Sequence, residues 1–452
     1  MSITRSLLNR QITYSEAQRE ETINVLQELT YVASARSFRY YIVKKREAIK
    51  IIVAHHLHLP QSSCHIDISD CSEWINGGSF NLCVPVSIQY LNKKAIRRVL
   101  MRFPLPYKVG GTKNGDEKIR CEAATYAWLN RECPDIPTAC LQGFGLSMGQ
   151  RNTGKMLSQS YAEQSHSATL RRNLFSDLAR IQLTLSQKPF PRIGSLTIDD
   201  DSIIRLNNRP FTLEICQLEN YKIPCEISRR TTYPTVDTYV HDLLSLHDNR
   251  LRYQANGASS MQDCISQMSA LATMRTIYPD FFRRKLRSGP FVLTLTDMHT
   301  SNFFVDDDWH ITKLVDLEWA CVRPIEMQHP PYWLTSQAEE EKKMAKEIGP
   351  FNIAEENLSY SGLLEKLWKE GTFWYCFALD SLTGLHHIFY NRIRPRYQTP
   401  YTGSKEFKFD DAFYIAAPTF WDTKAWNVML SKAEDKEKYD KELLDALQTQ
   451  VC

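Results

Sequence analysis

Three polar residues stand at fixed places around a predicted strand and a predicted hairpin, and this pattern constrains the fold more than any other feature. An apolar run that reads as a strand ends just before Asp297, and residues 303–315 read as a hairpin. Asn302 lies directly before the hairpin, and Asp316 follows its second strand. The chain is therefore expected to contain a strand, a polar loop and a hairpin in close succession.

These three residue types are the ones that phosphoryl transfer requires. A carboxylate such as Asp297 can accept the proton of an attacking hydroxyl, and the oxygens of Asn302 and Asp316 are ligands that hold Mg²⁺ against phosphates. Each residue also has a plainer interpretation, because Asp and Asn are common in turns and at strand ends. The order of all three, between and after apolar runs, favours the phosphoryl-transfer interpretation.

The composition is that of a soluble globular protein. The chain has 452 residues, 43% hydrophobic and 24% charged, and this length allows two or three domains. A net charge of +3 lacks the basic excess of a nucleic-acid-binding protein, and no apolar segment reaches the length of a membrane span. The 12 cysteines contain no C-x-x-C pair, so we expect mostly buried thiols in a reducing compartment and a cytoplasmic location.

Periodicity divides the chain into three predicted parts. Residues 1–64 are expected to form an N-terminal helical extension, and residues 146–452 a helical lobe for catalysis and substrate binding. Residues 65–145 are expected to form a β-rich nucleotide lobe, because apolar and polar residues alternate over 80–90 and a second strand follows at 98–103. The sum is an α+β fold with two lobes, and a cleft between such lobes is where a nucleotide would lie.

The helical parts follow from apolar faces at helical spacing. A helical region is expected from Ser15 to His56, with a break within 31–39. Further helices are expected over residues 117–129, 170–185, 236–246, 261–277, 338–346, 363–392 and after 433.

Residues 71–334 resemble the aminoglycoside phosphotransferase/choline kinase family, whose members share the protein-kinase-like two-lobed fold. The resemblance is most specific over 291–334, and the branch most resembled is the one abundant in fungi. It implies a protein-kinase-like fold, ATP and Mg²⁺ as cofactors, and a small-molecule hydroxyl as acceptor. In such an enzyme Asp297 would be the catalytic base, and Asn302 and Asp316 would be the Mg²⁺ ligands.

The resemblance also implies a set of nucleotide contacts in the β-rich lobe. The Gly-Gly turn within Asn76–Asn81 would be the loop over the phosphates, because glycine lets backbone N–H groups approach an anion. Arg102 would stand where a strand lysine contacts the phosphates, Glu122 would pair with it, and Glu318 would be a second acidic residue near the metal. The plainer interpretations are a simple turn, a surface arginine and an ordinary helix residue. The implied nucleotide contacts are Gly77, Gly78, Ser79, Arg102 and Glu122.

Three places depart from the family pattern. Leu295 replaces the histidine that usually stands two residues before the catalytic aspartate, and its packing against the core is expected to substitute. Arg102 replaces the usual lysine, and its permanent charge and paired donors still suit a phosphate. Residues 143–157 show no strand-like run, so we expect one strand and the adenine-binding hinge to be missing near Gln150–Thr153. Either the gene model skips coding sequence, or the adenine pocket is lost.

Two functions therefore stay open from the sequence. One is an ATP- and Mg²⁺-dependent phosphotransferase that acts on a small-molecule hydroxyl. The other is a catalytically inactive kinase-like scaffold or ligand-binding protein, which the missing hinge and Leu295 favour. Nucleotide binding would separate the two, and the sequence does not identify the acceptor.

Overall fold

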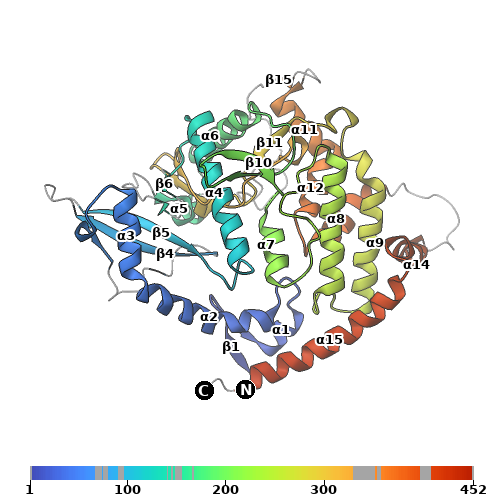
Figure 1. The fold of residues 1–452 in the computed structure, drawn as a ribbon. Helices are drawn as coiled ribbons and strands as arrows, with labels where there is room; N and C mark the ends of the chain where they lie inside the picture. The colour runs from blue at the N-terminus through green and yellow to red at the C-terminus, as the bar shows by residue number, and fades with distance from the viewer. Residues whose placement is uncertain are drawn as a thin grey trace.

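A small sheet-containing lobe and a large, mainly helical lobe make up the molecule, and the first two N-terminal helices run along its lower edge (Figure 1). This is the α+β two-lobed arrangement that the sequence predicts. The computed structural model describes residues 3–66, 74, 80–89, 96–139, 141–143, 146–147, 155–164, 167–328, 352–353, 358–397 and 409–449. Within these ranges, no helix has both the length and the apolar character to cross a membrane.

The N-terminal region consists of a two-stranded antiparallel ribbon and three helices. The helical prediction is confirmed, but the expected break is wrong: one helix runs unbroken through residues 31–39, and the chain turns instead at Lys45. The elements are β1 (Thr4–Ser6), β2 (Gln11–Thr13), α1 (Tyr14–Arg19), α2 (Val25–Lys44) and α3 (Arg46–His56).

The small lobe is built on a five-stranded antiparallel sheet with the order β3-β4-β5-β7-β6. The two long strands pair from Asn81 with Pro104 to Gln89 with Ile96, as the alternating pattern predicts. The strands are β3 (Cys64–His65), β4 (Asn81–Gln89), β5 (Ile96–Pro104), β6 (Leu141–Gly143) and β7 (Leu146–Ser147).

The prediction that no strand lies within residues 143–157 is wrong. Ser147 pairs with Leu100 and Leu146 with Met101, so β7 lies between β5 and β6. A two-residue strand has no readable periodicity, which explains why the sequence pattern missed it. The expected position of the missing hinge, Gln150–Thr153, lies outside the described residues.

The two largest hydrophobic clusters combine elements that lie far apart in the chain. Ile49 and Val53 of α3 share a buried cluster with Val84 and Val86 of β4, so the N-terminal extension supplies part of the small-lobe core. Helix α4 (Thr112–Glu132) follows β5 in the chain, yet it packs in the core of the large lobe. Its side chains in that core include Cys121, Ala124, Tyr126 and Leu129.

The large lobe holds several long helices and short sheets (Figure 1). The expected helices over 170–185, 236–246 and 261–277 are confirmed, whereas the expected helix at 338–346 lies outside the described residues. The aromatic-rich segment at 363–392 is helical but broken into successive helices. The helices are α5 (Leu157–Gln164), α6 (Ala168–Ser186), α7 (Leu213–Asn220), α8 (Val236–Tyr253), α9 (Met261–Ile277), α11 (Tyr360–Glu370), α12 (Thr372–Leu379), α13 (Leu385–Ile388), α14 (Phe409–Trp421) and α15 (Ala425–Gln448).

The strands of the large lobe form small antiparallel sheets. β9 pairs with β10, β11 pairs with β14, β15 pairs with β16, and β13, β12 and β8 form a three-stranded sheet. Their bounds are β8 (Lys155–Met156), β9 (Ser195–Ile198), β10 (Ile204–Asn208), β11 (Phe291–Thr294), β12 (Phe303–Val305), β13 (Ile311–Leu314), β14 (Cys321–Pro324), β15 (Asn352–Ile353) and β16 (Leu358–Ser359).

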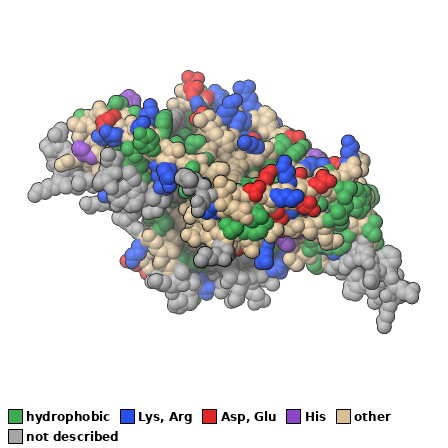
Figure 2. All heavy atoms as spheres, turned by 90° about the horizontal axis from the view of Figure 1, so that it is seen from below, with side chains coloured by type: hydrophobic (Ala, Val, Ile, Leu, Met, Phe, Trp, Pro, Cys, Tyr) green, Lys and Arg blue, Asp and Glu red, His purple; other side chains and the backbone are tan. Residues whose placement is uncertain are grey.

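The cysteines of the described residues agree with the sequence prediction. The nine cysteines among them are buried and free of disulfides, as expected. On the face seen from below, acidic and basic side chains stand next to each other (Figure 2).

Candidate active site

The strand, polar loop and hairpin that the sequence predicts are present as β11, its following loop and the β12–β13 hairpin. The Asp306 carboxylate accepts hydrogen bonds from the backbone N–H groups of Asp308 at 3.0 Å and His310 at 2.9 Å, which closes the hairpin turn. The first residue of β12 pairs with the last residue of β13. The flanking residues Asn302 and Asp316 therefore lie at the same end of the hairpin.

Hydrogen bonds fix the loop that carries Asp297. The Asn302 side chain is only 4% exposed, and its amide nitrogen donates to the backbone carbonyl oxygen of Asp297 at 2.7 Å. The backbone N–H of Val315 donates to the carbonyl oxygen of Asn302 at 3.0 Å, which ties the loop to the end of the hairpin. Because its amide nitrogen is engaged, the side-chain oxygen of Asn302 is the atom left for a ligand.

Asp316 has a backbone conformation that side-chain-bearing residues rarely adopt. Its φ angle is 63°, in the left-handed region, where Asp and Asn are tolerated better than other non-glycine residues. Such conformations cluster at functional sites. A small depression is lined by Asp297, Asn302 and Asp316 together. The three residues singled out in the sequence therefore meet at one place.

Arg102 of β5 joins three carboxylates at this site. Its guanidinium contacts Glu122, and its Nη2 lies 2.5 Å from an Asp316 oxygen and 2.9 Å from a Glu318 oxygen. The Arg102–Glu122 pair implied by the family resemblance is thus present. Burial opposes the charge of Arg102, but the three carboxylates outweigh it and raise its pKa above the usual range.

Lys118 and Asn81 belong to the same network. Sequence reasoning missed Lys118 and placed Asn81 only at the end of the predicted phosphate loop. Lys118 on α4 is fully buried, with its Nζ 2.5 Å from a Glu318 oxygen and 2.7 Å from the Asn81 side-chain oxygen. The Asn81 amide nitrogen donates to the same Glu318 oxygen at 2.6 Å. The available signal was the four-residue spacing of Lys118 and Glu122, which places both on one helix face. A lysine on a helix is usually solvated, so the pattern gave no reason to bury it.

Burial shifts the pKa of two carboxyl groups at the site. Burial raises the pKa of Glu318, although Lys118 lowers it. Burial also raises the pKa of Asp297, while His299 lowers it and Glu318 raises it further. A raised pKa suits a general base, because the best proton acceptor has a pKa near the working pH.

The oxygen atoms at the site fit a divalent cation. Carboxylate oxygens of Glu122, Asp316 and Glu318 lie within 4.8 Å of one another, and oxygen ligands are those that Mg²⁺ prefers. Asn302 adds an amide oxygen to the depression that Asp316 also lines. Arg102 already neutralises these carboxylates, so a bound cation would share or displace its contact with Asp316.

The other residues singled out in the sequence fall inside and outside the described ranges. Leu295 is partly buried and packs against the large-lobe core, as expected for a substitute of the usual histidine. The Nδ1 atom of His299 accepts a hydrogen bond from the Ser301 backbone N–H at 3.2 Å, so His299 supports the loop. Gly77, Gly78 and Ser79 lie outside the described residues, and the phosphate loop stays a prediction.

No family model matches the chain, and no curated protein matches it. Similar solved structures include the GDP complex of wild-type aminoglycoside 2'-phosphotransferase-IIIa, with 11% identity, a TM-score of 0.40, and 83% of this chain and 93% of that chain covered. The Plasmodium vivax ethanolamine kinase is 14% identical, with a TM-score of 0.37, and the match covers 82% of this chain and 85% of that chain. The choline kinase LicA from Streptococcus pneumoniae is 10% identical, with a TM-score of 0.36, and the match covers 77% of this chain and 89% of that chain. Because these identities and TM-scores are low, the function has to be argued from the chain's own residues.

Proposed function

We propose that the chain is an ATP- and Mg²⁺-dependent phosphotransferase that acts on a hydroxyl group of a small molecule. The observation that carries the proposal is the meeting of Asp297, Asn302 and Asp316 at one depression. Two cations, the partly buried Arg102 and the fully buried Lys118, lie in contact with the carboxylates beside it. Phosphoryl transfer needs little covalent chemistry from the protein, and such a set supplies the positioning and charge neutralisation on which it depends.

Asp297 is the proposed general base. Its carboxylate would take the proton of the acceptor hydroxyl, and the contact between Asn302 and the Asp297 backbone holds the loop during this transfer. Asn302 and Asp316 are the proposed ligands of Mg²⁺, which when bound would neutralise charge on the phosphate oxygens. Arg102 is the proposed phosphate contact, and Glu122 orients its guanidinium.

Asp316→Ala is expected to weaken Mg·ATP binding by about tenfold or more, which corresponds to about 1.4 kcal/mol or more. The substitution removes a carboxylate from the proposed ligand set and one partner of Arg102. Titration calorimetry of the full chain with ATP and Mg²⁺ measures the effect. Asp307→Ala is the matched control, because Asp307 lies in the neighbouring hairpin turn and its side chain is 98% exposed.

The calorimetric experiment separates the two open functions. Binding by the wild-type chain that persists in Asp307→Ala and is lost in Asp316→Ala supports the phosphotransferase. Equal Mg·ATP affinities of the two variants would show that Asp316 does not belong to the binding site. Absence of Mg·ATP binding by the wild-type chain would instead favour a catalytically inactive scaffold.

The acid limb of the pH–rate profile is expected at a pH above the usual pKa range of an aspartate. Asp297 has to be ionised to accept a proton, and burial raises its pKa from 3.8, so ATP turnover falls as the pH drops through the raised value. His299 lowers this pKa, so His299→Gln is expected to move the acid limb to higher pH. Turnover rates of both proteins across the acid range measure the shift. An acid limb at the same pH in both would refute the coupling of His299 to the base.

A further inference from the structure

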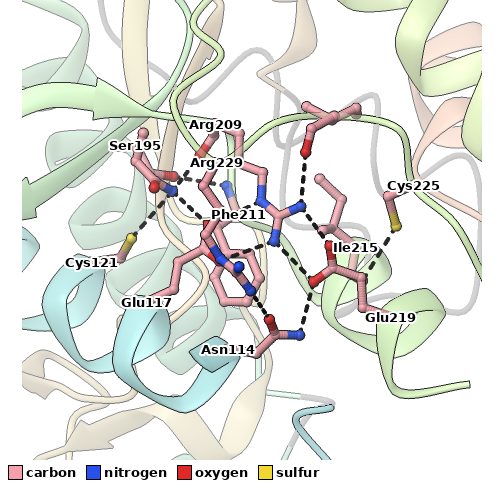
Figure 3. A network of polar contacts seen from close by, with 12 residues as sticks. Asn114, Glu117, Cys121, Ser195, Arg209, Phe211, Ile215, Glu219, Cys225 and Arg229 are labelled. Carbon is pink, nitrogen blue, oxygen red and sulfur yellow. Dashed lines mark hydrogen bonds and ion pairs between the residues drawn. The ribbon is translucent and has the colours of Figure 1, made fainter. Parts of the chain in front are cut away.

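We propose that Arg209 is a positioning residue that ties helix α4 to the large lobe, so that Lys118 and Glu122 reach the active site proposed above. This inference rests on the proposed function and deepens it. Figure 3 shows the polar network around Arg209, to which α4, the segment from β10 to α7 and the loop at Arg229 contribute. Side chains on α4 connect this network with the proposed active site, and so does Phe211, whose ring lies below the Arg209 guanidinium and contacts Trp319 at the depression.

The Arg209 guanidinium uses all of its N–H groups. Its Nε and Nη2 donate to the Glu117 carboxylate, each at 3.0 Å, and its Nη1 and Nη2 donate to Glu219 at 2.6 and 2.9 Å. The remaining Nη1 hydrogen bond goes to the backbone carbonyl oxygen of Ile227 at 3.1 Å. The Arg209 side chain is 2% exposed. A planar guanidinium that chelates two carboxylates fixes the direction of both.

Helix α4 is tied to the large lobe at two positions one turn apart. The Glu117 carboxylate also accepts hydrogen bonds from Arg229 Nε at 2.7 Å and from the Asn208 amide at 2.9 Å. Asn114 donates to Glu219 at 2.8 Å and contacts Arg229. The carboxylates and guanidinium groups of this network balance in charge, which favours a structural tie over a site for a charged ligand.

The tie acts on the proposed active site through the stiffness of the helix. Lys118 is the residue after Glu117, and Glu122 lies on the following turn. Fixing Glu117 therefore also fixes the backbone positions of Lys118 and Glu122. Lys118 contacts Glu318, and Glu122 contacts Arg102 of β5. Because α4 is anchored in the large lobe, a relative movement of the lobes would change the contact of Arg102 with Glu122 and leave the α4 anchor in place.

Arg209→Met in the full chain tests the inference with two measurements. Hydrogen exchange of the nucleotide-free protein is expected to become faster by about tenfold in residues 112–132, because α4 loses its anchor. Mg·ATP affinity is expected to fall by about tenfold, which corresponds to about 1.4 kcal/mol, because Lys118 and Glu122 no longer hold Glu318 and Arg102 in place. Arg323→Met is the matched control, since Arg323 is equally buried, at 2% exposure, and pairs with Asp380 after α12.

The outcomes distinguish this inference from the proposed function. Slow exchange of α4 in Arg209→Met, or equal Mg·ATP affinities of Arg209→Met and Arg323→Met, would overturn the positioning role. Failure of the proposed function shows differently, as absent Mg·ATP binding in the wild-type chain. If Arg209→Met does not fold, Arg209→Lys replaces it: a lysine keeps the charge but cannot chelate both carboxylates, so an intermediate loss of affinity is expected, and full wild-type affinity would overturn the inference.

Discussion

Asp297→Asn is expected to lower the rate of phosphoryl transfer by about 10²–10⁴-fold, the range found when a general base is removed, with Mg·ATP affinity close to wild type. The amide nearly keeps the shape of the carboxylate but cannot accept the proton of the acceptor hydroxyl. Asn302 donates to the backbone carbonyl at position 297, so the loop keeps its hydrogen bond in the variant. Steady-state ATP turnover measures the rate, and calorimetry measures the affinity.

The control for this substitution is Asp307→Asn, which makes the same chemical change on a side chain that is 98% exposed. It is expected to have wild-type turnover and wild-type affinity. Equal turnover in Asp297→Asn and Asp307→Asn would exclude Asp297 as the base. Loss of Mg·ATP binding in Asp297→Asn would show that the residue supports the nucleotide site and would remove the kinetic argument for a base.

Lys118→Met is expected to destabilise the folded chain by about 3 kcal/mol, near the lower end of the range for breaking a buried ion pair. The Lys118 and Glu318 side chains are 0% and 2% exposed, so the substitution leaves a buried carboxylate without its ammonium partner. Arg102 still contacts Glu318, which limits the loss. Equilibrium urea unfolding measures the free energy. Lys366→Met, on an exposed helix pair with Glu370, is the control and is expected to change stability by less than about 1 kcal/mol.

The pH dependence of this destabilisation has a defined sign. Burial raises the pKa of Glu318 from 4.5, so the folded state favours the neutral carboxyl form. As the pH falls through the raised pKa, Glu318 becomes protonated and no longer needs Lys118, so the difference between Lys118→Met and wild type should shrink. The double variant Lys118→Met/Glu318→Gln should recover most of the loss at neutral pH. A difference that grows toward acidic pH would contradict the ion-pair account.

The sequence pattern predicts the helices and strands that are determined by residues within the same segment. The strand pair of β4 and β5 follows from period-two alternation, and the segment from β11 to β13 follows from apolar runs on either side of a polar loop and turn. These are also the elements that carry Asn302, Asp316 and Arg102. The residues of the site that follow directly from a strand end or a hairpin end could therefore be found without a structure.

The remaining features depend on contacts that pattern does not encode. Strand β7 is too short for a period, and its existence depends on pairing with β5 and β6. Lys118 is buried because Glu318 and Asn81, far away in the sequence, meet it there. Glu117 and Arg209 are separated by 92 positions, and nothing in either local sequence indicates that they pair. Long-range polar networks of this kind require the fold before they can be recognised.

The most direct test of the central claim is to follow ATP by ³¹P NMR with the full chain and Mg²⁺, in buffer alone and with a pool of amino alcohols and sugars. The proposed function predicts that ATP loses its γ-phosphate in the presence of the acceptor pool, both with the wild-type chain and with Asp307→Asn. It predicts no loss above background with Asp297→Asn or Asp316→Ala. Intact ATP in every sample, together with absent Mg·ATP binding by the wild-type chain, would contradict the phosphotransferase and identify the protein as an inactive scaffold.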